Sequence, residues 1–321
     1  MSMSQKSPSE EKKSETVVKL KIADILIQMQ SEFKLEQFTD KELRDLKPER
    51  FNNFLYAGED KGKADIIIDI NIVDELPESS GAEDIFITYH PDDHNENWRL
   101  QRKEDSYVYR CPLKNKKQVM LVNQAFDRVS AYLLPKKDKG RVWNSADIVY
   151  DFLQVLLINY FALNKKGVFV HSMGVKDTDG NGLLFAGESG AGKSTAARLW
   201  HKYSKATVLN DDRIIVRKLE GKFFIYGSPW HGDFSDYLET HIGSAPLDKL
   251  FFISHAPENT AQRISKKEAF NLLYPALFPT FWDKGWLENV VSFCQDLVMN
   301  VSCFKLGLLN NETVIEFVRK I

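Results

Sequence analysis

The stretch Gly187-Glu188-Ser189-Gly190-Ala191-Gly192-Lys193-Ser194 decides how this sequence is interpreted. It fits the pattern G-x-x-x-x-G-K-[ST] at every fixed position, which a chain of this length does by chance about 1% of the time. Three glycines allow positive φ angles, so that backbone N–H groups can curl inward around anionic oxygens. Lys193 can then reach the β- and γ-phosphates of a nucleotide, and the Ser194 hydroxyl can ligate Mg²⁺.

The residues on either side supply the context that a phosphate-binding loop needs. The hydrophobic run 183–186 predicts a strand that enters the loop, and 193–203 predicts a helix that leaves it. That helix directs the positive end of its dipole at the same place. We therefore predict that residues 187–194, with the adjoining Thr195, bind the phosphates of ATP.

Two adjacent carboxylates follow the loop, in Leu209-Asn210-Asp211-Asp212-Arg213. A phosphoryl-transfer site needs one carboxylate that holds the metal and another group that accepts the proton of the attacking hydroxyl. Taken alone, Asp-Asp-Arg is more often a solvated strand end. Its position after a phosphate loop favours the catalytic interpretation.

The order of three segments resembles the catalytic domain of bacterial HPr kinase/phosphorylase, a family that shares its P-loop core with phosphoenolpyruvate carboxykinase. The segments are Val170-His171-Ser172-Met173-Gly174-Val175, the glycine-rich loop, and Asp211-Asp212-Arg213, within roughly residues 145 to 270. The resemblance implies that Ser194 and Asp212 serve Mg²⁺ and that Asp211 is the base that activates the acceptor hydroxyl. It implies that His171 sits beside the transferred phosphate and interacts with Asp211.

The chain also departs from that family. Thr195 stands where HPr kinase has Glu, and Tyr226 to Gly232 replaces a Gly- and Arg-rich signature that contacts the HPr protein. The chain is more similar to divergent HPr-kinase-related proteins, which phosphorylate peptide or free serine hydroxyls. We therefore expect an ATP- and Mg²⁺-dependent kinase with a serine-type acceptor, either a small molecule or a peptide. The relatives form oligomers, which implies a homo-oligomer.

Two other functions fit parts of the pattern. A nucleotide-binding regulator would use the loop without transferring phosphate, although it would not need both aspartates. A phosphoenolpyruvate carboxykinase would need a second metal site and cationic residues for a dicarboxylate, and the sequence identifies neither.

Secondary candidates have weaker signals. Trp230 and His231, between two glycines, fit an acceptor-binding or lid loop as well as they fit a turn with a surface Trp. Arg263 is more typical of a solvated side chain than of a phosphate contact. The aromatic residues of 278–286 are expected to cover the core, and the block 91–97, with its His among carboxylates, is expected to be a turn.

The rest of the chain predicts an α+β or α/β fold. We expect a disordered tail at 1–16, a β-rich N-terminal domain with leading helices at 17–140, and a P-loop mixed-sheet domain at 141–321, with the boundary in the charged segment 136–141.

Within 17–54, the spacing of Leu20, Ile22, Ile25, Leu26 and Met29 predicts a helix, followed by a short helix or turn at 41–54. Runs at 64–73, 84–89, 97–102, 106–111 and 118–122 predict an antiparallel sheet. A helix at 146–163, apolar nearly all round, should lie inside the domain, and strands should follow at 168–170, 207–209, 213–218 and 223–226.

Composition excludes several classes. Of 321 residues, 43% are hydrophobic and 27% charged, which is typical of a globular chain. A net charge of -2 gives no reason to expect nucleic-acid binding, and no run of about 18 apolar residues predicts a membrane helix. Three widely spaced cysteines predict reduced, buried thiols, so we expect a cytoplasmic protein.

Overall fold

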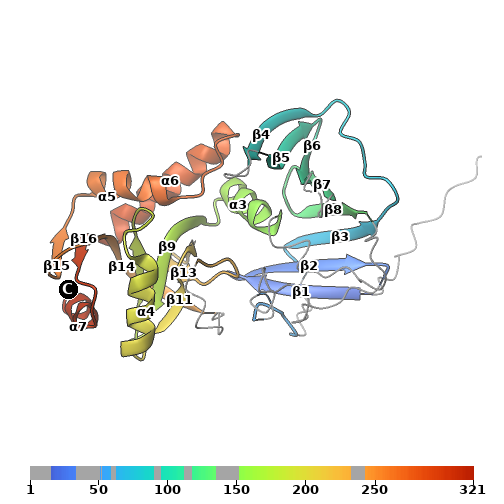
Figure 1. The fold of residues 1–321 in the computed structure, drawn as a ribbon. Coiled ribbons are helices and arrows are strands. Elements are labelled where there is room, and N and C mark those ends of the chain that lie inside the picture. Colours follow the sequence, from blue (N-terminus) through green and yellow to red (C-terminus); the bar gives the residue numbers. More distant parts are fainter. Residues whose placement is uncertain are drawn as a thin grey trace, which may run out of the picture.

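The computed structural model describes residues 16–33, 51, 53–58, 63–89, 95–111, 118–134, 152–232 and 243–321. These residues form a mixed α/β fold with two large mixed sheets and few helices. Figure 1 shows the two sheets side by side, with helix α3 (Phe152–Asn164) between them. The predicted tail lies outside the described residues, except that its last residue, Thr16, begins the first strand.

The first sheet is built from the N-terminal part of the chain. All five runs that the sequence predicted as strands are present, as β3 to β7. A further strand of this sheet, β8, was not predicted. The sheet is not wholly antiparallel as predicted, because β3 pairs in parallel with both β2 and β8. Its spatial order is β1 (Thr16–Ile22), β2 (Ile25–Ser31), β3 (Ile66–Ile72), β8 (Arg128–Leu133), β7 (Gln118–Asn123), β6 (Ser106–Cys111), β5 (Glu96–Lys103) and β4 (Glu83–Tyr89).

The leading helix predicted from residue 17 is wrong, because β1 and β2 form an antiparallel hairpin. Burial alternates along β1, with Val18, Leu20 and Ile22 in the core. The turn is made by Ala23 and Asp24, both with positive φ (47° and 58°), which is the geometry of a two-residue type I′ hairpin. The helix or turn predicted at 41–54 lies largely outside the described residues.

The second sheet belongs to the C-terminal part and is mixed, as predicted. β10 pairs in parallel with β14, and β14 does so with β16, whereas the other pairs are antiparallel. Because β10 pairs with both β9 and β14, the strands β9, β12, β13, β14 and β10 close on themselves. The strands are β9 (Val168–Lys176), β10 (Gly182–Ala186), β11 (Thr207–Asn210), β12 (Arg213–Leu219), β13 (Lys222–Tyr226), β14 (Ser244–His255), β15 (Thr260–Arg263) and β16 (Ser302–Leu308).

Helices pack around this second sheet and against α3. They are α4 (Lys193–Tyr203), α5 (Lys266–Leu273), α6 (Lys284–Asn300) and α7 (Thr313–Arg319). Helix α3 begins within the predicted range 146–163, whose first six residues lie outside the described part. Eight of its residues are buried, as its all-round apolar pattern predicted. Within the described ranges, no helix combines the length and apolar character needed to cross a membrane. All three cysteines are free and buried, as predicted.

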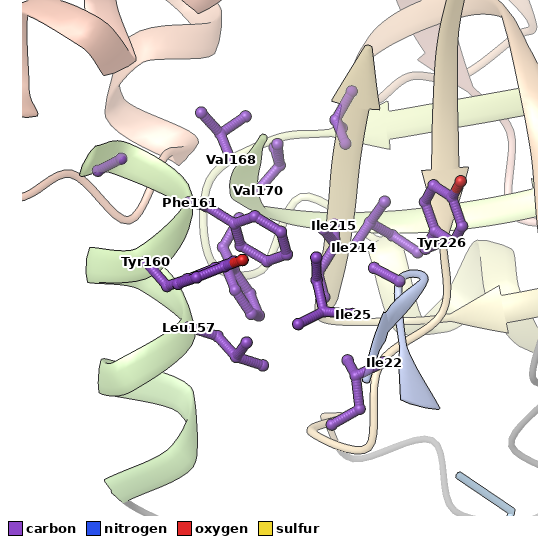
Figure 2. Close-up of a cluster of buried hydrophobic side chains, with 14 of the residues drawn as sticks. Ile22, Ile25, Leu157, Tyr160, Phe161, Val168, Val170, Ile214, Ile215 and Tyr226 are labelled. Atoms are coloured by element: carbon purple, nitrogen blue, oxygen red, sulfur yellow. The ribbon is translucent and has the colours of Figure 1, made fainter. Parts of the chain in front are cut away.

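The two sheets share one hydrophobic core. Figure 2 shows the hairpin residues Ile22 and Ile25 facing Leu157 and Phe161 of α3 and Ile215 of β12. These five side chains are at most 2% exposed. Since neither sheet completes this core alone, we expect the described parts to unfold together. The predicted boundary at 136–141 lies outside the described residues, so the division into domains stays a prediction.

Polar contacts fix the hairpin turn against the second sheet. The buried Arg217 guanidinium donates to the carbonyl oxygens of Ala23 and Lys166. The Tyr226 hydroxyl donates to the Asp24 carboxylate at 2.7 Å. The turn is thereby held in register with β12 and β13, and its buried carbonyl is satisfied.

We predict that Ile22→Ala lowers the free energy of unfolding by about 2–4 kcal/mol, because it opens a cavity in the shared core. Urea denaturation followed by fluorescence and far-UV circular dichroism should give one transition at a lower midpoint. Val17→Ala, on the same strand but 45% exposed, should change stability by less than about 0.5 kcal/mol. Two separate transitions in the Ile22 variant would contradict a shared core.

Candidate active site

The glycine-rich loop lies between a buried strand and a helix, as predicted. All five residues of β10 are buried, and α4 begins at Lys193 directly after the loop. Gly190 and Gly192 have φ angles of 80° and 101°, a region that side chains other than glycine rarely adopt. Glu188 and Ser189 are exposed, whereas Thr195 lies half-buried in the first turn of α4. The loop backbone therefore stands open at the N-terminus of a helix.

Gly187 is required for a different reason. The sequence predicted positive φ for all three glycines, but Gly187 does not belong to the positive-φ residues. A Cβ at this position would lie 2.9 Å from the Ala191 Cβ and 3.0 Å from the Ile253 carbonyl oxygen. Close packing between the loop and β14 therefore explains this glycine.

Lys193 lies inside the loop and is only 6% exposed. Its ammonium donates to the carbonyl oxygens of Gly187 at 2.9 Å and Glu188 at 3.0 Å. Burial lowers the pKa of Lys193, and the charges of Asp212 and Asp211 oppose that shift. The loop thus holds a cation close to Asp211 and Asp212, the two residues between β11 and β12. We call this connection the acidic turn.

The first aspartate, Asp211, is 1% exposed and joins three elements. It follows the last residue of β11, and one carboxylate oxygen accepts a hydrogen bond from the Ser194 hydroxyl of α4 at 3.1 Å. The other oxygen accepts from the backbone N–H of Gly232 at 3.0 Å. A Cβ on Gly232 would lie 3.0 Å from this carboxylate, so glycine allows the close approach.

The second aspartate, Asp212, pairs with His171 of β9. The His171 Nε2 lies 2.8 Å from Asp212 Oδ1, and Arg213 Nε lies 3.5 Å from Oδ2. Burial raises the pKa of the Asp212 carboxyl, but the hydrogen bond from His171 and the surrounding positive charges outweigh it, so the pKa lies below the ordinary 3.8. The His171 side chain is 39% exposed, so this pair reaches the surface of the site.

One pairing differs from what the resemblance implied, because His171 pairs with Asp212 and not with Asp211. The Ser194 hydroxyl, which the resemblance assigned to Mg²⁺ together with Asp212, bonds to Asp211. The two aspartates are adjacent in the chain, but their carboxylates serve different neighbours. Loop, acidic turn and histidine nevertheless meet in one place, as their grouping predicted.

Two residues at the site were missed. Asn210 is fully buried and holds the acidic turn through its amide, accepting from the backbone N–H groups of Asp212 and Arg213. An Asn before such a turn is an ordinary signal that could have been used. His255, at the exposed end of β14, lies 3.1 Å through Nε2 from the Gly190 carbonyl oxygen, and no motif marks it.

Trp230 is a core residue. It is 1% exposed and packs edge-on against Phe51 and Phe169, with ring centroids 5.9 Å apart in both pairs. The alternative of a turn with a surface Trp is therefore wrong. The indole also lacks the exposed surface that contact with an acceptor would need. His231 is half-buried, and its Nδ1 lies 2.8 Å from the Gly232 carbonyl oxygen.

The other residues that the sequence singled out lie in different surroundings. Arg263 is exposed on β15, as a solvated arginine should be. Phe278 lies near the site, 6.4 Å from the His171 ring and 5.4 Å from the Arg213 guanidinium carbon. Trp286 packs in the core as expected, but the same expectation is wrong for Phe281, which is 61% exposed. Most of the block 91–97 lies outside the described residues.

The Ser194 hydroxyl and the carboxylates of Asp211 and Asp212 offer oxygen ligands to a metal at this site. Within the part of the chain that the structure describes, no group of three or more His, Cys, Asp or Glu side chains is arranged to hold a metal. The Ser194 hydroxyl and the Asp211 carboxylate suit Mg²⁺, which keeps several waters and is bound by one or two carboxylates together with substrate phosphates. The donor set therefore fits a metal that arrives with a nucleotide.

No protein-family model matches the sequence, and no curated protein matches it. Among solved structures, a Hpr(Ser) kinase/phosphatase from Coxiella burnetii is similar at 11% sequence identity and a TM-score of 0.29. The match covers 47% of this chain and 90% of that chain. At this level the likeness has no weight in the choice of a function, which we base on the geometry of the site.

We predict that Asp212→Asn lowers the free energy of unfolding at pH 7 by about 1–2 kcal/mol, because it weakens a charged hydrogen bond. A lowered folded pKa stabilises the protein above the ordinary pKa, and this contribution is lost as pH falls through the folded value. The difference between wild type and variant should therefore shrink as the pH falls from 7 to about 3 in urea titrations. A difference that stays constant over this range would contradict the pairing.

Proposed function

We propose that this protein is an ATP- and Mg²⁺-dependent phosphotransferase that moves the γ-phosphate to an alcohol of the serine type, in a small molecule or a peptide. One observation carries the proposal. The Ser194 hydroxyl, which follows Lys193 at the start of α4, bonds directly to the buried Asp211 carboxylate, and the His171–Asp212 pair adjoins it. The groups that would bind phosphate, hold the metal and take the proton thus lie close together, which is what this reaction requires.

Residues 187–194 would bind the nucleotide phosphates. The positive φ angles at Gly190 and Gly192 turn the backbone into a concave loop, and the N-terminus of α4 adds its partial positive charge. Lys193 supplies a full charge from within the loop. Together these groups favour a polyphosphate over a single weak anion.

Ser194 and Asp211 would hold Mg²⁺, which when bound neutralises charge on the phosphate oxygens. This assignment moves the metal ligand from Asp212 to Asp211, because only Asp211 contacts the Ser194 hydroxyl. Asp211 is also the more deeply buried of the two carboxylates, and a cation would compensate its charge.

His171 and Asp212 would handle the proton. With Nε2 donating to Asp212, the neutral His171 keeps Nδ1 as an acceptor. The acceptor O–H bond breaks with its proton passing to Nδ1, a bond forms from that oxygen to the γ-phosphorus, and the bond from phosphorus to the ADP oxygen breaks. Asp212 would orient the imidazole and stabilise its charged form.

The test is incubation of the purified protein with γ-labelled ATP and Mg²⁺, with free serine and with serine-containing peptides as acceptors. Label that reaches an alcohol oxygen, stable to acid as a phosphomonoester, supports the proposal. Tight ATP binding without transfer to any acceptor would instead identify a nucleotide-binding regulator. Acceptor-independent release of phosphate alone would identify a nucleotide hydrolase.

We predict that Lys193→Ala weakens ATP binding by at least about tenfold and abolishes transfer, because it removes the charge that would contact the phosphates. Lys202→Ala is the matched control, since it removes an exposed lysine from the same helix. Binding is measured by calorimetry and transfer by label incorporation. Equal affinities in the two variants would exclude the loop as the phosphate site.

The two aspartates should have separable effects. Asp211→Asn should weaken Mg²⁺-dependent ATP binding, whereas Asp212→Asn should leave affinity within about threefold and lower kcat by roughly a hundredfold. The reverse pattern, with Asp211→Asn sparing affinity, would return the base to Asp211 and the metal to Asp212.

A further inference from the structure

A continuous set of contacts runs from the N-terminal sheet to the buried aspartate. It begins at Phe51, which is 1% exposed and precedes a segment that lies along the edge of β1. The Phe54 N–H donates to the Phe51 carbonyl at 2.9 Å, and the Phe54 carbonyl accepts from the Lys21 N–H at 2.8 Å. The Tyr56 N–H donates to the Lys19 carbonyl at 2.9 Å. Backbone bonds to the first sheet therefore anchor this segment.

The second link is the packing of Phe51 on Trp230. The rings meet edge to face, with an interplanar angle of 87° and centroids 5.9 Å apart. The opposite contact of Trp230 is Phe169 of β9, two residues from His171. The indole is thus held between the two sheets, and its position depends on both.

The third link is Asn210, whose amide uses all its bonding capacity on two backbone segments. Nδ2 donates to the carbonyls of Ser228 and Trp230, both at 2.9 Å. Oδ1 accepts from the N–H groups of Asp212 and Arg213, both at 2.8 Å. A shift of the Trp230 backbone would therefore break buried hydrogen bonds unless the acidic turn moved with it.

The last link is a hydrogen bond to the Asp211 carboxylate. The Gly232 N–H, two residues beyond Trp230, donates to Asp211 Oδ1 at 3.0 Å, while Ser194 bonds the other oxygen. Asp211 thereby accepts one hydrogen bond from Ser194 of α4 and one from the segment 228–232, which we call the Trp230 segment. Each of these two donors stabilises the charge, because removing a hydrogen bond from an almost fully buried carboxylate is costly.

We infer that Phe51, Trp230 and Asn210 are positioning residues through which the N-terminal sheet fixes Asp211 at the active site. None of them touches the reacting groups, and their effect on turnover rests on the proposed function. A displacement of about 1 Å at a reacting centre can cost roughly a hundredfold in rate, so loosening this path lowers kcat while the phosphate loop still binds ATP. The N-terminal sheet is then part of the catalytic apparatus.

The experiment compares Phe51→Leu with Phe126→Leu. Both residues are 1% exposed aromatic side chains in the N-terminal part, but Phe126 packs on Tyr107 and Trp286, away from Trp230. Hydrogen exchange is followed in peptides that cover 209–213 and 228–232, and steady-state transfer is measured on the same samples. Trp230→Phe, a milder change at the next link, is included in case Phe51→Leu folds poorly.

Phe51→Leu and Trp230→Phe should speed exchange in both peptides by about tenfold, and Phe126→Leu should not. The same two variants should lower kcat by about tenfold or more with the ATP KM within about twofold, unlike the control. Equal exchange and equal kcat in the Phe51 and Phe126 variants would overturn the inference. If wild type transfers no phosphate, the proposed function fails, while the exchange comparison still decides whether the path exists.

Discussion

The carboxylate of Asp211 is the group on which the arrangement of the site depends. A nearly fully buried negative charge is tolerated only when donors or cations surround it. Here the donors come from α4 and from the segment after Trp230, with the Lys193 charge nearby. The glycine-rich loop, the acidic turn and the Trp230 segment therefore satisfy one charge together.

That requirement extends to the rest of the molecule. The Trp230 segment is held by Asn210 on one side and by the ring of Phe51 on the other. Phe51 belongs to the N-terminal part, whose hairpin also places Ile22 and Ile25 in the core beneath β12. The sheet that carries the histidine and the sheet that carries the hairpin thus form one packed body around the site.

Local features were predictable from the sequence and non-local ones were not. The loop 187–194 and helix α4 follow from a short motif whose geometry is fixed by neighbouring residues. The β1–β2 hairpin was missed because the spacing of its apolar residues fits a helix as well as a strand, and because its turn places Ala and Asp, not Gly, at positive φ. The parallel pairing of β3 with β8 joins residues about sixty positions apart, which no local pattern reports. The same limit applies to the aspartates. Their type and order predicted a site, but the partner of each depends on where β9, α4 and the Trp230 segment meet in space.

The most direct test is a crystal structure of the protein with Mg²⁺ and a non-hydrolysable ATP analogue. We predict that the phosphates lie along the backbone N–H groups of 187–194, with Lys193 beside them. Oxygens of Ser194 and Asp211 should coordinate the metal directly or face it through water, and the His171–Asp212 pair should stay intact beside the γ-phosphate. A nucleotide bound elsewhere, or a metal held by Asp212 with His171 displaced, would contradict this prediction.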